Sequence, residues 1–230
     1  VHTFFLSRYV GVNPANGQAL FLDEDDNVTT TNTGNVFLSG KTPFAQFDGG
    51  FNTSASYKGF DLTADFYFKG GNYIYNAVES QQLSDGTSAN NNQRLDAFNY
   101  WQQPGDTNVL PNPIVNGYNG TTNANNRNVS SGTSTRYLQR GDYIRLRNLQ
   151  IGYSVPSQYL EKVPFTQIRM YFSGTNLWTY VPYYKGDPEV GLGSAESNPD
   201  SSTRNQIPGE YSLNSYPTLR TISYGIDLKF

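Results

Sequence analysis

Apolar and polar residues alternate along much of the chain with a period of two, which is typical of β-strands with one apolar and one polar face. The alternation is most regular in residues 46–57 and 60–70, which flank the dipeptide Lys58-Gly59. Two alternating segments separated by a short break that contains glycine form a β-hairpin, so we expect an antiparallel pair of strands here. The same alternation recurs in residues 167–180 and 218–230.

Residues 143–155 also alternate, but the phase of the alternation changes inside the segment. The apolar positions are even-numbered up to Leu146 and odd-numbered from Leu149 onward. One extra residue near Arg147-Asn148 restores a single apolar face, so we predict a β-bulge there. Residues 2–12 form a further, less regular segment, which gives six predicted strands in all.

The connections between these strands are short and long in strict alternation. The short ones are Lys58-Gly59 and 156–164, and the long ones, rich in Asn, Gly, Ser and Thr, are 13–44, 76–136 and 181–216. Outer-membrane β-barrels have this layout, with tight periplasmic turns and long extracellular loops. The five regular segments also reach the roughly 9–11 residues that a tilted strand needs to cross a bilayer.

The composition agrees with aromatic strands joined by turns. Aromatic residues make up 15% of the chain, and charged residues also make up only 15%, below the roughly 25% of an average soluble domain. The formal net charge of -3 gives no electrostatic basis for binding nucleic acid. Cysteine is absent and there is a single histidine, which excludes disulfides, thiolate metal sites and sites that need two histidines.

The chain opens at Val1 directly in a strand-like run, without an initiator methionine or the basic and apolar segments of a signal peptide. We therefore expect it to be part of a longer protein. No segment approaches the roughly 18 consecutive apolar residues of a membrane-spanning helix.

Several motifs resemble those of the SusC/RagA family of TonB-linked outer-membrane transporters, which is typical of Bacteroidetes. The resemblance covers nearly the whole chain and rests on the order and spacing of the motifs. They are GVNPANG (11–17), YKGFDL (57–62), YWQQPG (100–105), GDYIRLRNLQIGYSVP (141–156), RMYFSGTNLWT (169–179), GDPE (186–189) and GIDLKF (225–230). The chain departs from the family pattern at Asn13, where aspartate is usual, and it lacks the arginine that usually precedes Trp101.

The resemblance implies an all-β fold, an antiparallel segment of a transmembrane β-barrel with long extracellular loops. Residues 1–230 would supply about the last six strands of a 22-stranded plugged barrel, with the plug and the TonB-contacting region outside this chain. The family imports oligosaccharides or peptides across the outer membrane. Its partners are a SusD-like surface lipoprotein that acts as a lid, and TonB, which contacts the plug. The resemblance implies no cofactor.

Aromatic residues are the candidate site residues. Trp101, Tyr118, Tyr183 and Tyr184 are candidates for substrate contact. For Trp101 and Tyr118, in the longest loop, packing within the loop or contact with the lid lipoprotein is an equally good explanation. For Tyr183 and Tyr184 the alternative is a place in the aromatic belt. Trp178 and Tyr180 lie where a strand reaches the membrane surface and are predicted to form part of an aromatic belt. The terminal Phe230 resembles the signal read by the outer-membrane assembly machinery, and its alternative is an ordinary lipid-facing aromatic.

Charged residues on the predicted polar face suggest ion pairs more than a ligand site. Arg145, Arg147 and Arg169 fall on or near this face, where an acidic substrate is one possible partner. We predict instead that they pair with aspartates on neighbouring strands, because opposite charges across strands need no ligand. The candidate partners are Asp61, Asp65 and Asp227.

The acidic run of residues 23–27 contains oxygen ligands of the type that Ca²⁺ prefers. Its spacing is not that of an EF-hand loop, so we expect a solvated acidic loop and no metal site. The chain has no Ser-His-Asp order and no cysteine, so we do not expect an enzyme.

Two other hypotheses fit parts of the pattern. A secreted soluble β-sandwich, such as a carbohydrate-binding module or adhesin, also has alternating strands and long loops. A sandwich covers its apolar faces with each other, whereas a barrel turns them to lipid. A complete small outer-membrane barrel is a weaker hypothesis, because such barrels start at eight strands.

Overall fold

The computed structural model describes residues 3–30, 32, 41–83, 85, 92–113, 134–189, 210–211 and 217–230. The chain divides into two compact units. The sheet unit comprises Ala45–Asn72, Arg140–Val190 and Tyr216–Phe230, and the loop unit comprises Val1–Phe44, Tyr73–Gln139 and Gly191–Ser215. No helix in the described ranges is long and apolar enough to cross a membrane.

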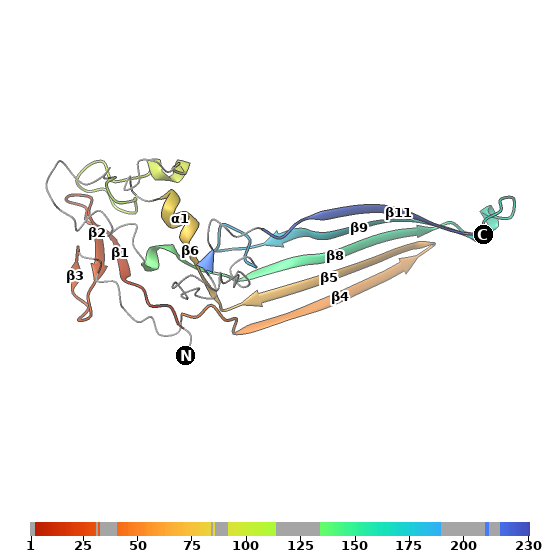
Figure 1. Cartoon of the computed structure of the whole chain (residues 1–230), viewed down its shortest axis with the longest axis horizontal. Helices are drawn as coiled ribbons and strands as arrows, with labels where there is room; N and C mark the ends of the chain where they lie inside the picture. The colour runs from red at the N-terminus through yellow and green to blue at the C-terminus, as the bar shows by residue number, and fades with distance from the viewer. Residues whose placement is uncertain are drawn as a thin grey trace, which may run out of the picture. The chain divides into compact units, whose positions relative to one another are not determined.

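Five long strands that run side by side make up the sheet unit (Figure 1). They are β4 (Phe47–Tyr57), β5 (Phe60–Gly70), β8 (Tyr143–Ser154), β9 (Gln167–Tyr180) and β11 (Thr221–Lys229). Their order in the sheet is β11-β9-β8-β5-β4, and every neighbouring pair is antiparallel. The five regular segments of the sequence therefore form the strands that their alternation predicts, and the antiparallel all-β fold is confirmed.

The predicted hairpin is closed by the two residues Lys58 and Gly59. Both have positive φ angles, 46° and 86°, which is the backbone that a two-residue turn needs to match the twist of its strands. The next residues on either side, Tyr57 and Phe60, are paired. A short 3-10 helix, η3 (Ser157–Tyr159), lies in the other short connection.

The predicted β-bulge lies where the phase of the alternation changes. The register of β8 shifts between Leu146 and Asn148 against β9 and at the matching place against β5, so Arg147 is the bulged residue. On β9 the register skips Asn176 and Leu177 at this place. Asn176 has a positive φ of 54° and donates a side-chain hydrogen bond to the carbonyl of Leu219. The sequence pattern thus located this irregularity correctly.

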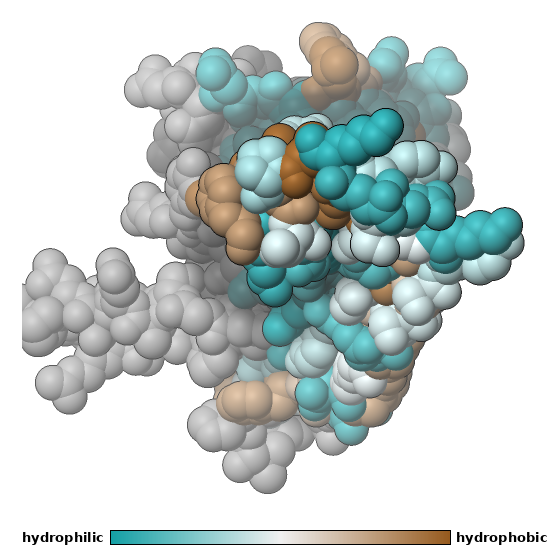
Figure 2. Space-filling model, turned by 90° about the vertical axis from the view of Figure 1, so that its right-hand side faces the viewer, coloured by the Kyte–Doolittle hydropathy of each residue, from teal (hydrophilic) through white to brown (hydrophobic). Residues whose placement is uncertain are grey.

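Apolar residues of all five strands lie on one face of the sheet, because cross-strand partners share a face. The paired positions include Phe51 with Phe66, Leu62 with Ile151, Leu146 with Trp178, and Phe172 with Tyr224. This face is exposed; Ile226 in the middle of β11, for example, is 65% exposed. Viewed from the end of the sheet where the turns lie, hydrophobic residues gather in patches beside strongly hydrophilic ones (Figure 2).

The exposed apolar face argues against the β-sandwich hypothesis. A sandwich would bury these side chains against a second sheet about 10 Å away. In the described part of the chain they remain open on all five strands, which is the arrangement expected of a wall that faces lipid.

The loop unit contains short elements around a small core. Its strands are β1 (Arg8–Val12), β2 (Ala19–Leu22), β3 (Val28–Thr29), β6 (Tyr73–Asn76), β7 (Leu138–Arg140, whose last residue belongs to the sheet unit) and β10 (Glu210–Tyr211). Its helices are α1 (Ala77–Gln82), η1 (Leu95–Phe98) and η2 (Thr135–Tyr137). Asn76 caps α1 by accepting a hydrogen bond from the Glu79 amide. The fully buried side chains include Phe4, Leu6, Phe21, Ile74 and Tyr137.

The prediction of a sixth barrel strand in residues 2–12 is wrong. The strand found there, β1, belongs to a three-stranded sheet with β2 and β3 in the loop unit. The physical reason is burial, because Phe4 and Leu6 lie in the core of the loop unit instead of on an exposed apolar face. Similarly, the long connection 13–44 contains β2 and β3 and is not the structureless loop that the sequence suggested.

Candidate functional site

Aromatic side chains mark the ends of strands on the apolar face. Trp178 and Tyr180, at the end of β9, are about half exposed, and their rings are stacked with centroids 6.3 Å apart. Rings at the end of an apolar strand face suit an aromatic belt, which stays a prediction here. Phe230 is largely exposed and lies beside Phe165, with ring centroids 5.0 Å apart. Its role as an assembly signal also stays a prediction.

The opposite face of the sheet carries a dense cluster of charges. Residues 181–189, which follow β9 and which we call the β9 strap, reach the side chain of Arg145 on β8. Arg145 Nη2 lies 2.5 Å from Asp187 Oδ1, Nη1 donates to Glu189, and Nε donates to Thr179 Oγ1 over 3.0 Å. The Arg145 side chain is only 3% exposed. Among the described ion pairs of the sheet unit, Arg145 is the least exposed side chain, and a buried guanidinium needs partners of this kind for its donors.

Glu189 joins three side chains of β8 to the end of the strap. Besides Arg145, it accepts a hydrogen bond from the hydroxyl of Tyr143 over 2.6 Å and one from Arg147 Nη2 over 2.8 Å. The guanidinium of Arg147 lies over the ring of Tyr67 on β5, 4.1 Å from its centroid, a cation–π distance. The bulge therefore directs Arg147 toward the strap and not toward the apolar face.

Asp187 is held in its ionised form by its surroundings. Burial alone would raise the pKa of this carboxyl, but hydrogen bonds from Thr218, from the Glu189 amide and from Arg145 lower the pKa below its ordinary value. The Thr218 amide donates to Asp187 over 2.7 Å and the Glu189 amide over 3.1 Å. The strap is thus fastened both to β8 and to the residues that precede β11.

The predicted cross-strand ion pairs are partly correct. Arg169 on β9 lies 2.6 Å from Asp61 on β5 and 3.6 Å from Asp227 on β11, as expected. A Cβ on Gly152 between them would meet both charged groups at about 2.5 Å, so only glycine leaves room for this pair. The prediction that Asp65 pairs with an arginine is wrong.

The partners of Arg145 and Arg147 come from the β9 strap, and Asp65 has other partners. Its carboxylate accepts hydrogen bonds from the side-chain amides of Asn52 and Asn148. The sequence did contain a signal for the true partners, since Asp187 and Glu189 stand in the GDPE motif. The composition of residues 181–189 does not by itself predict that they fold back over the strands.

Three of the four candidates for substrate contact lie among the described residues, one in the loop unit and two in the sheet unit. Trp101, in the loop unit, donates from Nε1 to the carbonyl of Pro14 over 3.1 Å and packs so tightly on Gly17 that a Cβ there would meet the ring at 2.7 Å. The motifs GVNPANG and YWQQPG therefore dock on each other. Tyr118 lies outside the described residues.

Tyr183 and Tyr184, in the β9 strap, have different surroundings. Tyr183 is more than half exposed, with the Arg140 guanidinium 4.5 Å from its ring centroid. Tyr184 is only 4% exposed and packs against Gly186. Of these two, Tyr183 is the ring that is open to a ligand in this structure.

The acidic run is the turn between β2 and β3. Asp23 accepts hydrogen bonds from the backbone of Asn27 and Asp25, and these bonds lower its pKa. Asp26 pairs with Arg8. Across the ranges that the structure describes, no group of three or more acidic or histidine side chains is arranged to hold a metal ion.

Long antiparallel strands with one exposed apolar face and one ion-paired polar face are the arrangement of a transmembrane β-barrel wall. The five-stranded sheet unit is such a wall, open at β4 and β11. The chain is similar over 93% of its length to TonB-dependent receptors of Formosa agariphila, at 30% identity to receptor P3, 30% to receptor P39 and 26% to receptor P26. The resemblance to TonB-linked receptors of the SusC/RagA family is confirmed.

The solved structures show the same fold. The RagAB peptide importer superposes on 99% of the chain with a TM-score of 0.75 in its closed-closed state, at 24% identity, and with the same score in its open-open state, at 23% identity. No protein-family profile matches the chain. The chain spans about a fifth of the length of the curated relatives it matches, 19% for receptors P3 and P39 and 20% for receptor P26.

Proposed function

We propose that the chain forms part of the wall and outer loops of a TonB-dependent transporter in the outer membrane, which imports oligosaccharides or peptides. The observation that carries the proposal is the division of the sheet unit into two faces. Residues such as Phe51 and Ile226 are exposed on one face, whereas Arg145 and Arg169 are held in ion pairs on the other. Lipid on one side and a polar lumen on the other would satisfy both faces.

The proposal extends to partners. β4 and β11 each have a free edge among the described strands, and lipid does not tolerate unpaired backbone groups. Other strands of the same transporter would pair with these edges. A SusD-like surface lipoprotein would cover the outer loops and TonB would act through a plug, in the manner implied by the family. The similar RagAB structure is that of a peptide importer, which supports import as the function.

The first test is to locate the protein and identify what accompanies it. The intact protein, tagged in its native host, would be extracted from purified outer membrane with detergent, and the co-purifying proteins identified by mass spectrometry. We expect recovery from the outer membrane together with a surface lipoprotein. Recovery from the soluble fraction alone would contradict the proposal and would favour the alternative hypothesis of a secreted carbohydrate-binding module or adhesin.

Growth on defined nutrients then tests transport. A deletion strain should lose growth on a particular oligosaccharide or peptide mixture and regain it with the intact gene. An unchanged growth profile on both classes of nutrient would argue against import of either.

A further inference from the structure

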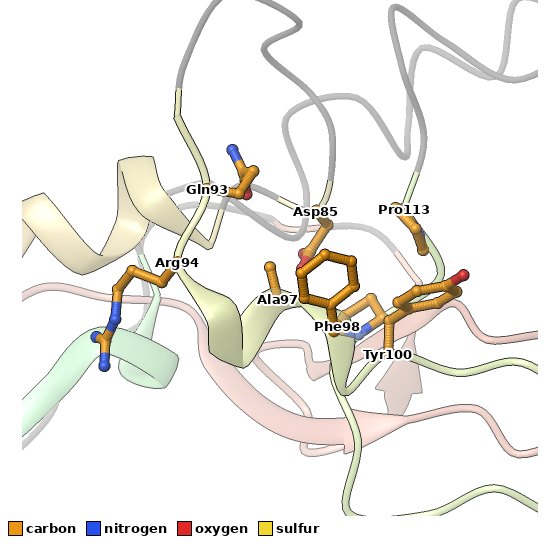
Figure 3. A pocket seen from close by; sticks show the side chains of 8 residues that line it. Asp85, Gln93, Arg94, Ala97, Phe98, Tyr100 and Pro113 are labelled. Atoms are coloured by element: carbon orange, nitrogen blue, oxygen red, sulfur yellow. The ribbon is translucent and has the colours of Figure 1, made fainter.

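The loop unit contains a cavity of about 290 Å³ next to η1. Most of its lining is apolar, with the rings of Phe98 and Tyr100 and the side chains of Ala97 and two prolines. In the close-up the two rings lie near Asp85 and Pro113 (Figure 3). Phe98 is 74% exposed although it borders a hollow, and an exposed apolar ring beside a cavity gains from being covered by a ligand.

The charged groups at the cavity are already matched by partners in the protein. Asp85 forms two hydrogen bonds with the buried guanidinium of Arg136, over 2.5 and 2.8 Å. Arg94 pairs with Glu79 over 3.0 Å and with Asp96 over 2.6 Å, and its guanidinium points away from the rings (Figure 3). A charged ligand would therefore displace existing ion pairs, whereas an uncharged apolar ligand would not.

The size of the cavity suits a ring. An apolar cavity of roughly 150 Å³ is enough to bind benzene, and this one is about twice as large. Tyr100 lines the cavity as well, and a phenol hydroxyl can form a hydrogen bond with the peptide backbone on which such a ring is carried. A sugar ring, in contrast, brings several hydroxyls whose burial against prolines and phenylalanine would leave them without partners.

We propose that this cavity is a binding site for an apolar ring-shaped side chain of a peptide, such as phenylalanine. The proposal rests on the proposed function, because an importer would meet such a peptide on the outer side of the membrane. The cavity selects one side chain, with Phe98 and Tyr100 as the residues that contact it.

The test is calorimetric titration of the intact protein in detergent with two blocked tetrapeptides, Gly-Phe-Gly-Gly and Gly-Ala-Gly-Gly. We expect the phenylalanine peptide to bind about tenfold more tightly or better, which corresponds to burial of one aromatic side chain. Phe98→Ala should raise its Kd about tenfold, and Ala97→Leu should do the same by filling the cavity. Leu95→Ala is the matched control, because Leu95 is 83% exposed on the same short helix and does not line the cavity.

Three results would overturn the proposal: equal affinity for the two peptides, equal loss in the Leu95→Ala control, or binding of maltohexaose that Phe98→Ala weakens. These results leave the proposed function standing if the protein is recovered from the outer membrane. Recovery from the soluble fraction would overturn the proposed function whatever the titration shows, so the two failures are distinguishable.

Discussion

The two units of the chain differ in where they place their large apolar side chains. The loop unit places Phe4, Phe21 and Tyr137 out of contact with solvent, as a water-soluble domain does. The sheet unit instead exposes many of its phenylalanines and isoleucines and buries Arg145 in an ion-pair cluster. The same types of residue are therefore buried in one unit and exposed in the other, according to what surrounds each unit. Under the proposed function, water borders the loop unit and lipid borders the apolar face of the sheet unit.

The largest expected effect is in the core of the loop unit. Arg136 and Asp85 form a buried ion pair with side chains 6% and 3% exposed. Arg136→Met would leave the Asp85 carboxylate buried without its partner, which costs about 3–5 kcal/mol. We expect hydrogen–deuterium exchange of the intact protein to rise sharply in residues 134–139 and to stay unchanged in β8 and β9. The double variant Arg136→Met, Asp85→Leu removes both charges and should recover most of the lost protection.

A second prediction concerns the exposed apolar face of the sheet unit. Ile226→Lys places a charge on the apolar face in the middle of β11, and a lysine facing the bilayer midplane costs about 2–4 kcal/mol. Denaturant unfolding of the intact protein in phospholipid vesicles would measure the loss. Ser223→Lys, on the polar face of the same strand, is the matched control and should cost much less. Equal effects of the two variants would mean that lipid does not border this face.

The smallest expected effect concerns the β9 strap and its dependence on pH. The lowered pKa of Asp187 means that its stabilising contribution is fully present above the ordinary aspartate value of about 3.9 and is lost as the pH falls through the lower folded value. Exchange protection of residues 185–189 should therefore persist at pH 5 and fall only in stronger acid. Asp187→Asn should remove about 1.5–3 kcal/mol of this local stability at neutral pH. Protection in this variant that equals the original protein would show that the carboxylate does not fasten the strap.

The strands of the sheet unit were predictable because their information is local. The alternation of apolar residues, the Lys58-Gly59 turn and the phase change at Arg147 each lie within one or two adjacent strands, and each is present in the structure. The pair between Arg169 and Asp61 was also predictable, because both residues fall on the polar face of the wall.

What the sequence did not reveal depends on contacts between distant segments. Residues 2–12 alternate weakly, and their place in the loop unit is shown by the pairing of β1 with β2 and by the burial of Phe4 and Leu6. The pair between Arg136 and Asp85 joins residues 51 positions apart in polar loops, where no periodicity marks them. The partners of Arg145 likewise lie in a loop that folds back over the sheet. The alternation of apolar and polar residues in the strands does not indicate where a loop will fold.

The fastening of the β9 strap also balances charge. The guanidinium groups of Arg145 and Arg147 face the carboxylates of Asp187 and Glu189, so two positive and two negative charges give the cluster no net charge. Movement of the strap away from the sheet would remove both carboxylates and leave the two neighbouring arginines of β8 without these partners. Their field would reach about 8 Å at physiological ionic strength. With the strap in place, as in this structure, these two arginines present no unbalanced positive charge on this stretch of β8.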